Sequence, residues 1–117
     1  MKASIKRVEK PWGYELIFAH TEHYAGKILH VNPGQALSFQ YHEEKDETLY
    51  MHEGAVELVV EENGSVVEQT LSAGESYRIR PYVKHRMVAG EDGCDIIEVS
   101  TPQLDDVVRI EDRYGRA

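Results

Sequence analysis

Residues 34–54 read GQALSFQYHEEKDETLYMHEG, and the interpretation of the whole chain starts from this stretch. Side chains two apart on a strand project to the same face, so Gln40 and His42 point together. A charged turn over residues 43–46 follows them. Glu47 then opens the next run, where its carboxylate can face the same space. The stretch therefore predicts two strands that share one polar wall.

Short predicted strands continue along nearly the whole chain. Runs rich in β-branched and aromatic residues alternate with turn residues, and helix signals are nearly absent. This spacing is typical of a β-sandwich or β-barrel. The predicted strands lie at residues 14–19, 25–31, 36–42, 47–53, 55–61, 65–71, 75–80, 84–89, 94–100 and 107–112.

The strongest single hairpin signal is Asn63-Gly64, which lies between two alternating runs. Both central residues of a type I′ turn need positive φ, which asparagine and glycine adopt most readily. In the run before it, Val56, Leu58 and Val60 share one face while Glu57 takes the other. This pattern indicates a sheet with one packed face and one wetter face.

The chain has 117 residues and a formal net charge of −8 at pH 7. We expect one domain over residues 1–117, with a core barrel at about 14–100 and terminal segments that pack on the barrel or on a dimer partner. The mixed, net negative charge argues against nucleic-acid and anionic-membrane partners. A phosphorylated small molecule remains compatible with it, because a basic pocket does not need a basic protein.

A single cysteine, Cys94, excludes an internal disulfide and a thiolate metal cluster. The first ten residues lack the apolar region of a signal peptide, and no apolar run is long enough to span a bilayer. We therefore expect a soluble, cytoplasmic protein.

A fourth polar landmark, His85, follows the turn over residues 81–84. Gln40, His42, Glu47 and His85 together offer two imidazoles, a carboxylate and an amide oxygen. Such a mixed set suits one borderline divalent ion and leaves positions open for water or substrate. The alternative is a set of satisfied polar side chains on a barrel wall, with no metal.

These residues resemble the cupins, whose first motif reads G-x5-H-x-H-x3-4-E-x6-G. Gly34, His42, Glu47 and Gly54 keep that spacing, with Gln40 in place of the first histidine. The second cupin motif is matched less well, although the separation of Gly74 from His85 is kept. The resemblance implies an all-β, single-domain cupin, a double-stranded β-helix or jelly-roll barrel. It also implies one divalent ion, with Zn, Mn, Fe, Co and Ni all open.

Within the cupins, the chain resembles type II mannose-6-phosphate isomerases, which often form the C-terminal domain of a bifunctional mannose-1-phosphate guanylyltransferase. Residues 10–15, 31–34, 37–42, 84–86, 97–99 and 106–116 carry this similarity. Where those isomerases typically show Q-x-H-H-H-R-x-E-H-W, this chain reads QYHEEKDETL. The resemblance implies a homodimeric isomerase that acts on a sugar phosphate.

Two lysines are candidates for proton transfer in such a reaction. Lys27 shares a strand face with apolar residues, so it either reaches the rim or is kept there for function, with a pKa lowered by desolvation. Lys45 stands at the arginine position of the family, although a solvated charged turn is the alternative. By the same resemblance, Arg86, Arg113 and Arg116 are expected phosphate contacts. Ser38 lies on the Gln40 wall and is an expected substrate contact.

Three functions compete at this point. The first is a metal-dependent aldose–ketose isomerase with mannose 6-phosphate as the first substrate to try. The second is an iron-dependent oxygenase, against which Gln40 counts, because such cupins usually present three histidines. The third is a non-catalytic metal- or sugar-binding module, which the departures beside Glu47 favour.

Overall fold

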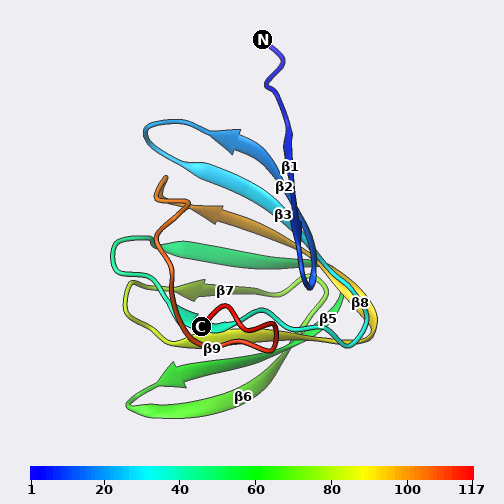
Figure 1. Ribbon diagram of the computed structural model, residues 1–117, viewed down its shortest axis with the longest axis vertical. Helices are drawn as coiled ribbons and strands as arrows, with labels where there is room; N and C mark the ends of the chain where they lie inside the picture. The colour runs from blue at the N-terminus through cyan, green and yellow to red at the C-terminus, as the bar shows by residue number, and fades with distance from the viewer.

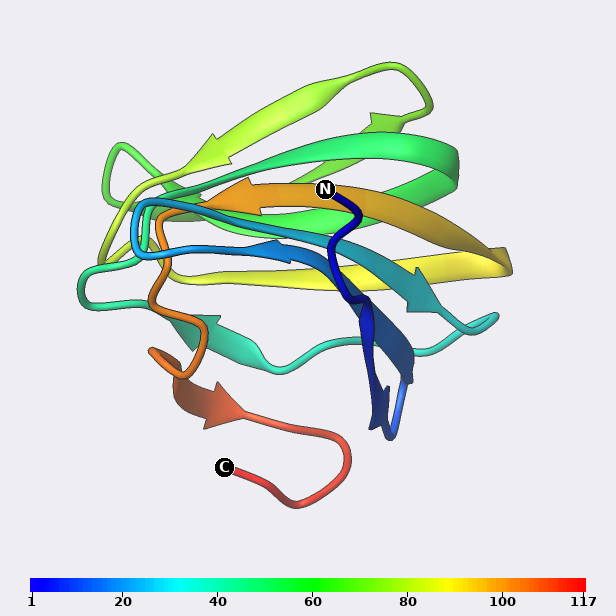
Figure 2. The same ribbon diagram turned by 90° about the horizontal axis from the view of Figure 1, so that it is seen from above.

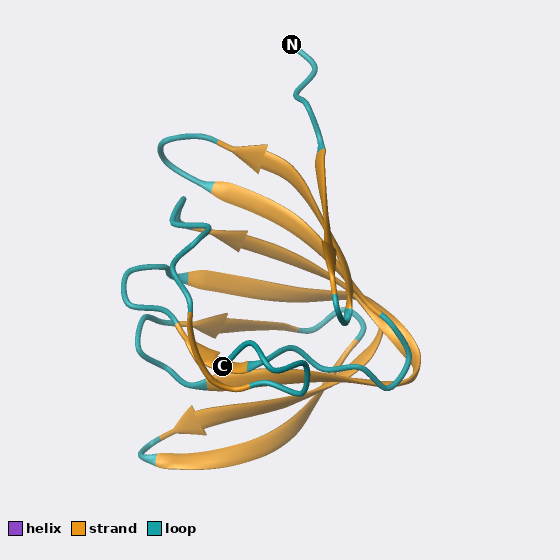
Figure 3. Cartoon of the chain, viewed as in Figure 1, coloured by secondary structure: helices purple, strands orange, loops and turns teal.

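The computed structural model describes residues 1–117 and consists of β-strands joined by turns and loops, with no helix (Figure 3). This confirms the all-β prediction. Accordingly, the structure holds no helix that is long and apolar enough to cross a membrane. The strands are β1 (Lys6–Lys10), β2 (Gly13–His20), β3 (Ala25–Val31), β4 (Phe39–Tyr41), β5 (Glu47–Glu62), β6 (Ser65–Ser72), β7 (Ser76–Ile79), β8 (His85–Ser100) and β9 (Val108–Glu111).

The nine strands form one antiparallel sheet that curls around a common interior (Figures 1 and 2). One path through the sheet runs β1-β2-β3-β8-β4-β9, while β5 pairs with β6, β7 and β8. The curl gives the sheet a largely buried inner face and an outer face that meets solvent. The chain after β8 crosses the mouth of this half-barrel before β9 pairs with β4.

The two longest strands, β5 and β8, run through positions that we predicted as turns. β5 continues past Gly54, and β8 continues through residues 90–93. The pairing between them shifts register near Met51 and Gly54. Gly54 has φ 80°, and a Cβ there would lie 2.6 Å from the carbonyl oxygen of Gly93. These glycines therefore bend the strands at bulges rather than ending them.

The predicted hairpin and face pattern are confirmed. Asn63 has φ 52° and Gly64 has φ 81°, and they join β5 to β6 with Glu62 opposite Ser65. Val56 and its two alternate neighbours along β5 are buried, whereas Glu57 is exposed.

Strand β1 was not predicted. It pairs antiparallel with β2, from Lys6 opposite Ile17 to Lys10 opposite Gly13. As an edge strand with mostly exposed side chains, it shows no apolar alternation.

The apolar core is a cluster of 15 buried residues on the inner face, among them Trp12, Leu29, Leu58 and Ile96. The same strands also send buried charged side chains inward, at positions that keep the inward parity of their apolar neighbours. Charged groups are rarely buried without partners. Their contacts define the candidate site.

Candidate metal centre

Three buried side chains from separate elements meet in the interior. His42 follows β4, Glu47 opens β5 and His85 opens β8, and each is 2% exposed or less. Nε2 of His42 and Nε2 of His85 each lie 3.2 Å from Oε1 of Glu47. The potential ligand atoms of the three residues all lie within 4.8 Å of one another. The structure thus brings together three of the four predicted ligands.

The other ring nitrogen of each histidine faces a backbone carbonyl. Nδ1 of His42 lies 2.6 Å from the oxygen of Asp106, and Nδ1 of His85 lies 3.0 Å from the oxygen of Val83. A carbonyl oxygen only accepts, so Nδ1 carries a hydrogen in each ring, and a metal ion would be bound through Nε2. Outer contacts of this kind orient metal-binding histidines.

Nε2 of His42, Nε2 of His85 and the carboxylate of Glu47 therefore converge on one point, and Nε2 of His85 is buried without a hydrogen-bond partner. Burial opposes ionisation of Glu47, but His42, His85 and Lys45 outweigh it and hold the pKa of Glu47 well below its usual range. A carboxylate with two imidazole nitrogens is a ligand set that fits a divalent metal ion.

Gln40 lies on the wall next to this triad. It is paired in register with His85 across β4 and β8, and it lines the same pocket as His42. Oε1 of Gln40 accepts a hydrogen bond of 2.6 Å from the hydroxyl of Ser38, which is buried. The predicted ligand Gln40 and the predicted substrate contact Ser38 thus share one surface.

The second oxygen of Glu47 faces a buried lysine. Nζ of Lys45 lies 3.1 Å from Oε2 of Glu47 and 3.2 Å from Oε2 of Glu98. Lys45 is only 4% exposed, so the solvated alternative for this charged turn is wrong. Burial lowers the pKa of Lys45, but Glu98 and Glu47 outweigh that effect and raise it above its usual value. Lys45 therefore keeps its proton.

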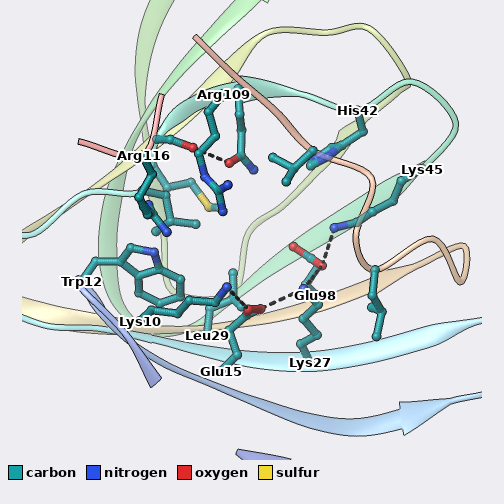
Figure 4. Close-up of a pocket in the computed structure, with 16 residues that line it drawn as sticks. Lys10, Trp12, Glu15, Lys27, Leu29, His42, Lys45, Glu98, Arg109 and Arg116 are labelled. Carbon is teal, nitrogen blue, oxygen red and sulfur yellow. Dashed lines mark hydrogen bonds and ion pairs between the residues drawn. The ribbon is translucent and has the colours of Figure 1, made fainter. Parts of the chain in front are cut away.

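The chain of charges continues away from the triad (Figure 4). Nζ of Lys27 lies 3.9 Å from Oε2 of Glu98 and 2.8 Å from Oε2 of Glu15. Nζ of Lys10 lies 3.4 Å from the other oxygen of Glu15. Lys27 is buried within this network, so it does not reach the rim.

Glu98 was not predicted as a site residue. Burial raises its pKa to about 7, the charge of Glu47 adds to this, and Lys45 and Lys27 partly offset it. A signal for it exists in the sequence, because Glu98 has the inward parity of Ile96 on β8.

A pocket with an empty volume of about 540 Å³, counting its open mouth, adjoins the triad. His42 and Trp12 lie on opposite sides of it in Figure 4, and Gln40, Leu29 and Glu98 also line it. Its further lining residues are Lys10, Glu15, Lys27, Leu37, Ser38, Lys45, Met87, Leu104, Val107, Arg109 and Arg116.

The C-terminal segment (residues 102–117) supplies the arginines of this pocket, but only in part the expected ones. Arg116 lines it, as does Arg109, which was not among the expected phosphate contacts. Arg86 instead donates to the carbonyl oxygens of Leu37 and Glu111, at 3.1 Å each. Arg113 is exposed and donates to the carbonyl oxygen of Gly34. Arg86 and Arg113 lie outside the pocket lining.

The C-terminal segment also holds the ligand-bearing turn. The carboxylate of Asp106 accepts backbone N–H bonds from Glu43 at 3.0 Å, Glu44 at 2.7 Å and Lys45 at 2.9 Å. Its own carbonyl oxygen is the partner of His42. One residue thus positions both the turn and a predicted ligand.

Residues 27–100 match the cupin domain family. The mannose-1-phosphate guanylyltransferase ManC of Salmonella typhimurium is 38% identical over 116 residues, which cover 95% of this chain and 23% of that protein. The mannose-1-phosphate guanylyltransferase of Escherichia coli is 34% identical with the same coverage. The chain therefore spans about a quarter of the length of these relatives.

Solved structures share the fold. KdgF from Halomonas superposes with a TM-score of 0.70 at 23% identity, covering 88% of this chain and 91% of that one. Oxalate decarboxylase from Bacillus subtilis superposes with a TM-score of 0.80 at 16% identity, covering 91% of this chain and 30% of that one.

Proposed function

Because the chain belongs to the cupin domain family, we propose that it is a metal-dependent isomerase that interconverts an aldose phosphate and a ketose phosphate. Mannose 6-phosphate is the first substrate to test. The observation that carries this proposal is the convergence of His42, Glu47 and His85 beside a pocket that also contains the buried carboxylate of Glu98. That arrangement supports a metal site with a proton-transfer group next to it.

The metal would be held by His42, Glu47 and His85, with Gln40 on the same wall. When bound, a divalent ion supplies an electrophile that polarises a sugar carbonyl and stabilises the negative charge of an enediolate. Three protein ligands are fewer than a divalent ion takes, so such an ion would have positions left for water or substrate. Ser38 orients the Gln40 amide through its hydroxyl.

Proton transfer between adjacent carbons needs a group that can take up a proton and return it. We assign this role to Glu98, because its carboxylate lines the pocket beside the triad and its burial raises its pKa. Lys45, at 3.2 Å, keeps its proton and would stabilise charge on the substrate oxygens. Glu15 would hold the ammonium group of Lys27, and that ammonium group would in turn position Glu98. The two predicted catalytic lysines thus become partners of the base.

The names of the relatives support the substrate class. Both guanylyltransferases are named for mannose 1-phosphate, a hexose phosphate. This chain aligns with only 23% of either protein, so the guanylyltransferase activity itself is not part of the proposal.

The test is metal analysis of the purified protein followed by an assay for interconversion of mannose 6-phosphate and fructose 6-phosphate. His85→Ala should lose metal and turnover together. His52→Ala removes an exposed histidine of β5 and serves as the matched control that keeps both. Glu98→Gln should keep the metal and lose turnover. A metal-loaded protein that converts no sugar phosphate would contradict the isomerase and leave a binding module.

A further inference from the structure

Five cationic side chains line the pocket, and one of them has no carboxylate partner. Arg109 forms no salt bridge and no hydrogen bond through its side chain, in contrast to the other four. The paired cations are Lys10 and Lys27 with Glu15, Lys45 with Glu47 and Glu98, and Arg116 with Asp112. The pocket therefore holds a surplus positive charge in a protein whose net charge is −8.

The unpaired arginine is also partly desolvated. Nε of Arg109 is buried and has no hydrogen-bond acceptor. A buried donor on a charged group is costly unless an acceptor, preferably an anion, meets it. Figure 4 shows the Arg109 side chain reaching into the pocket beside Arg116 and across from Trp12. A ligand that enters the pocket can supply the missing acceptor.

Strand register places Arg109 next to the candidate metal ligands. On β9 it is paired with Gln40 of β4, and Gln40 is paired with His85 of β8. Cross-strand partners project from the same face, with Cβ atoms about 5 Å apart. A group bound at Arg109 therefore lies in the same row of side chains as the metal site.

Arg116 adds a second guanidinium to this corner. Its Nε and Nη2 donate to the carboxylate of Asp112 at 2.9 Å each, which fixes its position. Nη1 takes no part in these bonds. Because the salt bridge orients Arg116 without occupying all its donors, it can contact the same anion as Arg109.

We propose that Arg109, with Arg116 beside it, forms the subsite for the phosphate monoester of the substrate. This rests on the proposed function for the identity of the sugar, but not for the presence of an anion site. Guanidinium groups match the geometry of phosphate oxygens. Two guanidinium groups together suit a doubly charged phosphate monoester better than they suit a singly charged carboxylate ligand. The phosphate would then anchor the sugar while its carbonyl end meets the triad.

Inorganic phosphate is the probe, titrated by calorimetry into the chain with and without added Mn²⁺, and acetate is titrated in parallel. Arg109→Met keeps the stem and removes the charge, and it should weaken phosphate binding about tenfold or more in both metal states. Arg109→Lys should recover part of the lost phosphate affinity, because lysine restores the positive charge but not the planar, two-pronged donor geometry of a guanidinium group. Arg80→Ala removes an exposed arginine after β7 and is the control for charge alone.

Arg113→Ala tests the assignment expected from the family resemblance. Loss of phosphate binding in Arg113→Ala but not in Arg109→Met would overturn the proposal, as would equal losses in Arg109→Met and Arg80→Ala. Acetate binding as tight as phosphate binding would overturn the assignment to a phosphate monoester.

The proposed phosphate subsite and the proposed isomerase activity can be refuted by different results. Phosphate binding that depends on Arg109 in a chain that converts no sugar phosphate supports the subsite and refutes the isomerase. A chain that converts mannose 6-phosphate with the same KM in wild type and Arg109→Met retains the isomerase and overturns the subsite.

Discussion

Replacing Asp106 by asparagine should loosen the turn that carries His42 and Glu47. The Asp106 carboxylate accepts three backbone N–H bonds, two of them at Oδ2. Asparagine has one side-chain oxygen. If that oxygen takes the place of Oδ2, the bonds from Glu44 and Lys45 survive, while the amide nitrogen faces the N–H of Glu43. The variant thus loses one bond and the charge that strengthens the other two.

The expected loss follows from the strength of such bonds. A hydrogen bond to a charged group contributes about 1.5–3 kcal/mol, and because Asp106 is partly exposed the low end applies, about 1.5 kcal/mol. In urea unfolding of the metal-free protein, the lower free energy of unfolding should appear as a lower midpoint urea concentration, with an unchanged dependence of the free energy on urea concentration. Asp105→Asn removes the same charge from an exposed neighbour whose side chain makes no hydrogen bond, so it should be neutral.

The pH dependence has a definite sign. Burial acts to raise the pKa of Asp106, but the three N–H bonds outweigh it and hold the pKa below its usual value. A carboxylate with a lowered pKa stabilises the folded state above its unfolded pKa of about 3.9 and loses that effect as the pH falls through the folded pKa. The difference between wild type and Asp106→Asn should therefore shrink below about pH 4. Equal stability of the Asp105 and Asp106 variants at pH 7 would refute this reasoning.

Three further predictions concern other parts of the chain. Gly64→Ala should destabilise the protein by about 1–2 kcal/mol because φ is 81° there, whereas Gly90→Ala, with open space and no positive φ, should be nearly neutral in the same urea titration. Burial, with Asp95 adding, raises the pKa of Cys94 to about 11, so iodoacetamide at pH 8 should label the folded protein at least about tenfold more slowly than the urea-unfolded protein; equal rates would show that the thiol is accessible. A divalent ion at 100 times its Kd should stabilise the fold by about 2.7 kcal/mol, and a thermal scan of His42→Ala should show no such gain.

Most of the sheet was predictable because strand periodicity reports directly on which side chains face inward. The turn at Asn63-Gly64 and the buried face of β5 followed from this rule. Gly54 and residues 90–93 were misread because glycine serves turns and bulges alike, and only the partner strand decides between them. β1 was not predicted because an edge strand with mostly exposed side chains shows no alternation of apolar and polar residues.

Some residues of the candidate site could likewise be predicted from the sequence, and others could not. The spacing of His42 and Glu47 within one stretch made their convergence predictable, since only the turn over residues 43–46 separates them. Glu98 could have been found as an acidic residue at an inward position. Arg109 could not, because its place beside Gln40 depends on pairing between strands distant in sequence. The carbonyl contacts of Arg86 have no sequence signal either.

The pocket is assembled from two parts that can change independently. The triad belongs to the central strands, while Arg109 and Arg116 belong to the C-terminal segment. Mutations confined to that segment, with Asp106 kept, can alter which molecule is anchored without disturbing the site that would perform chemistry on it. Libraries at positions 107–116 are therefore the economical starting point for directed evolution of new substrate preferences on this scaffold, and natural descendants can diverge by the same route.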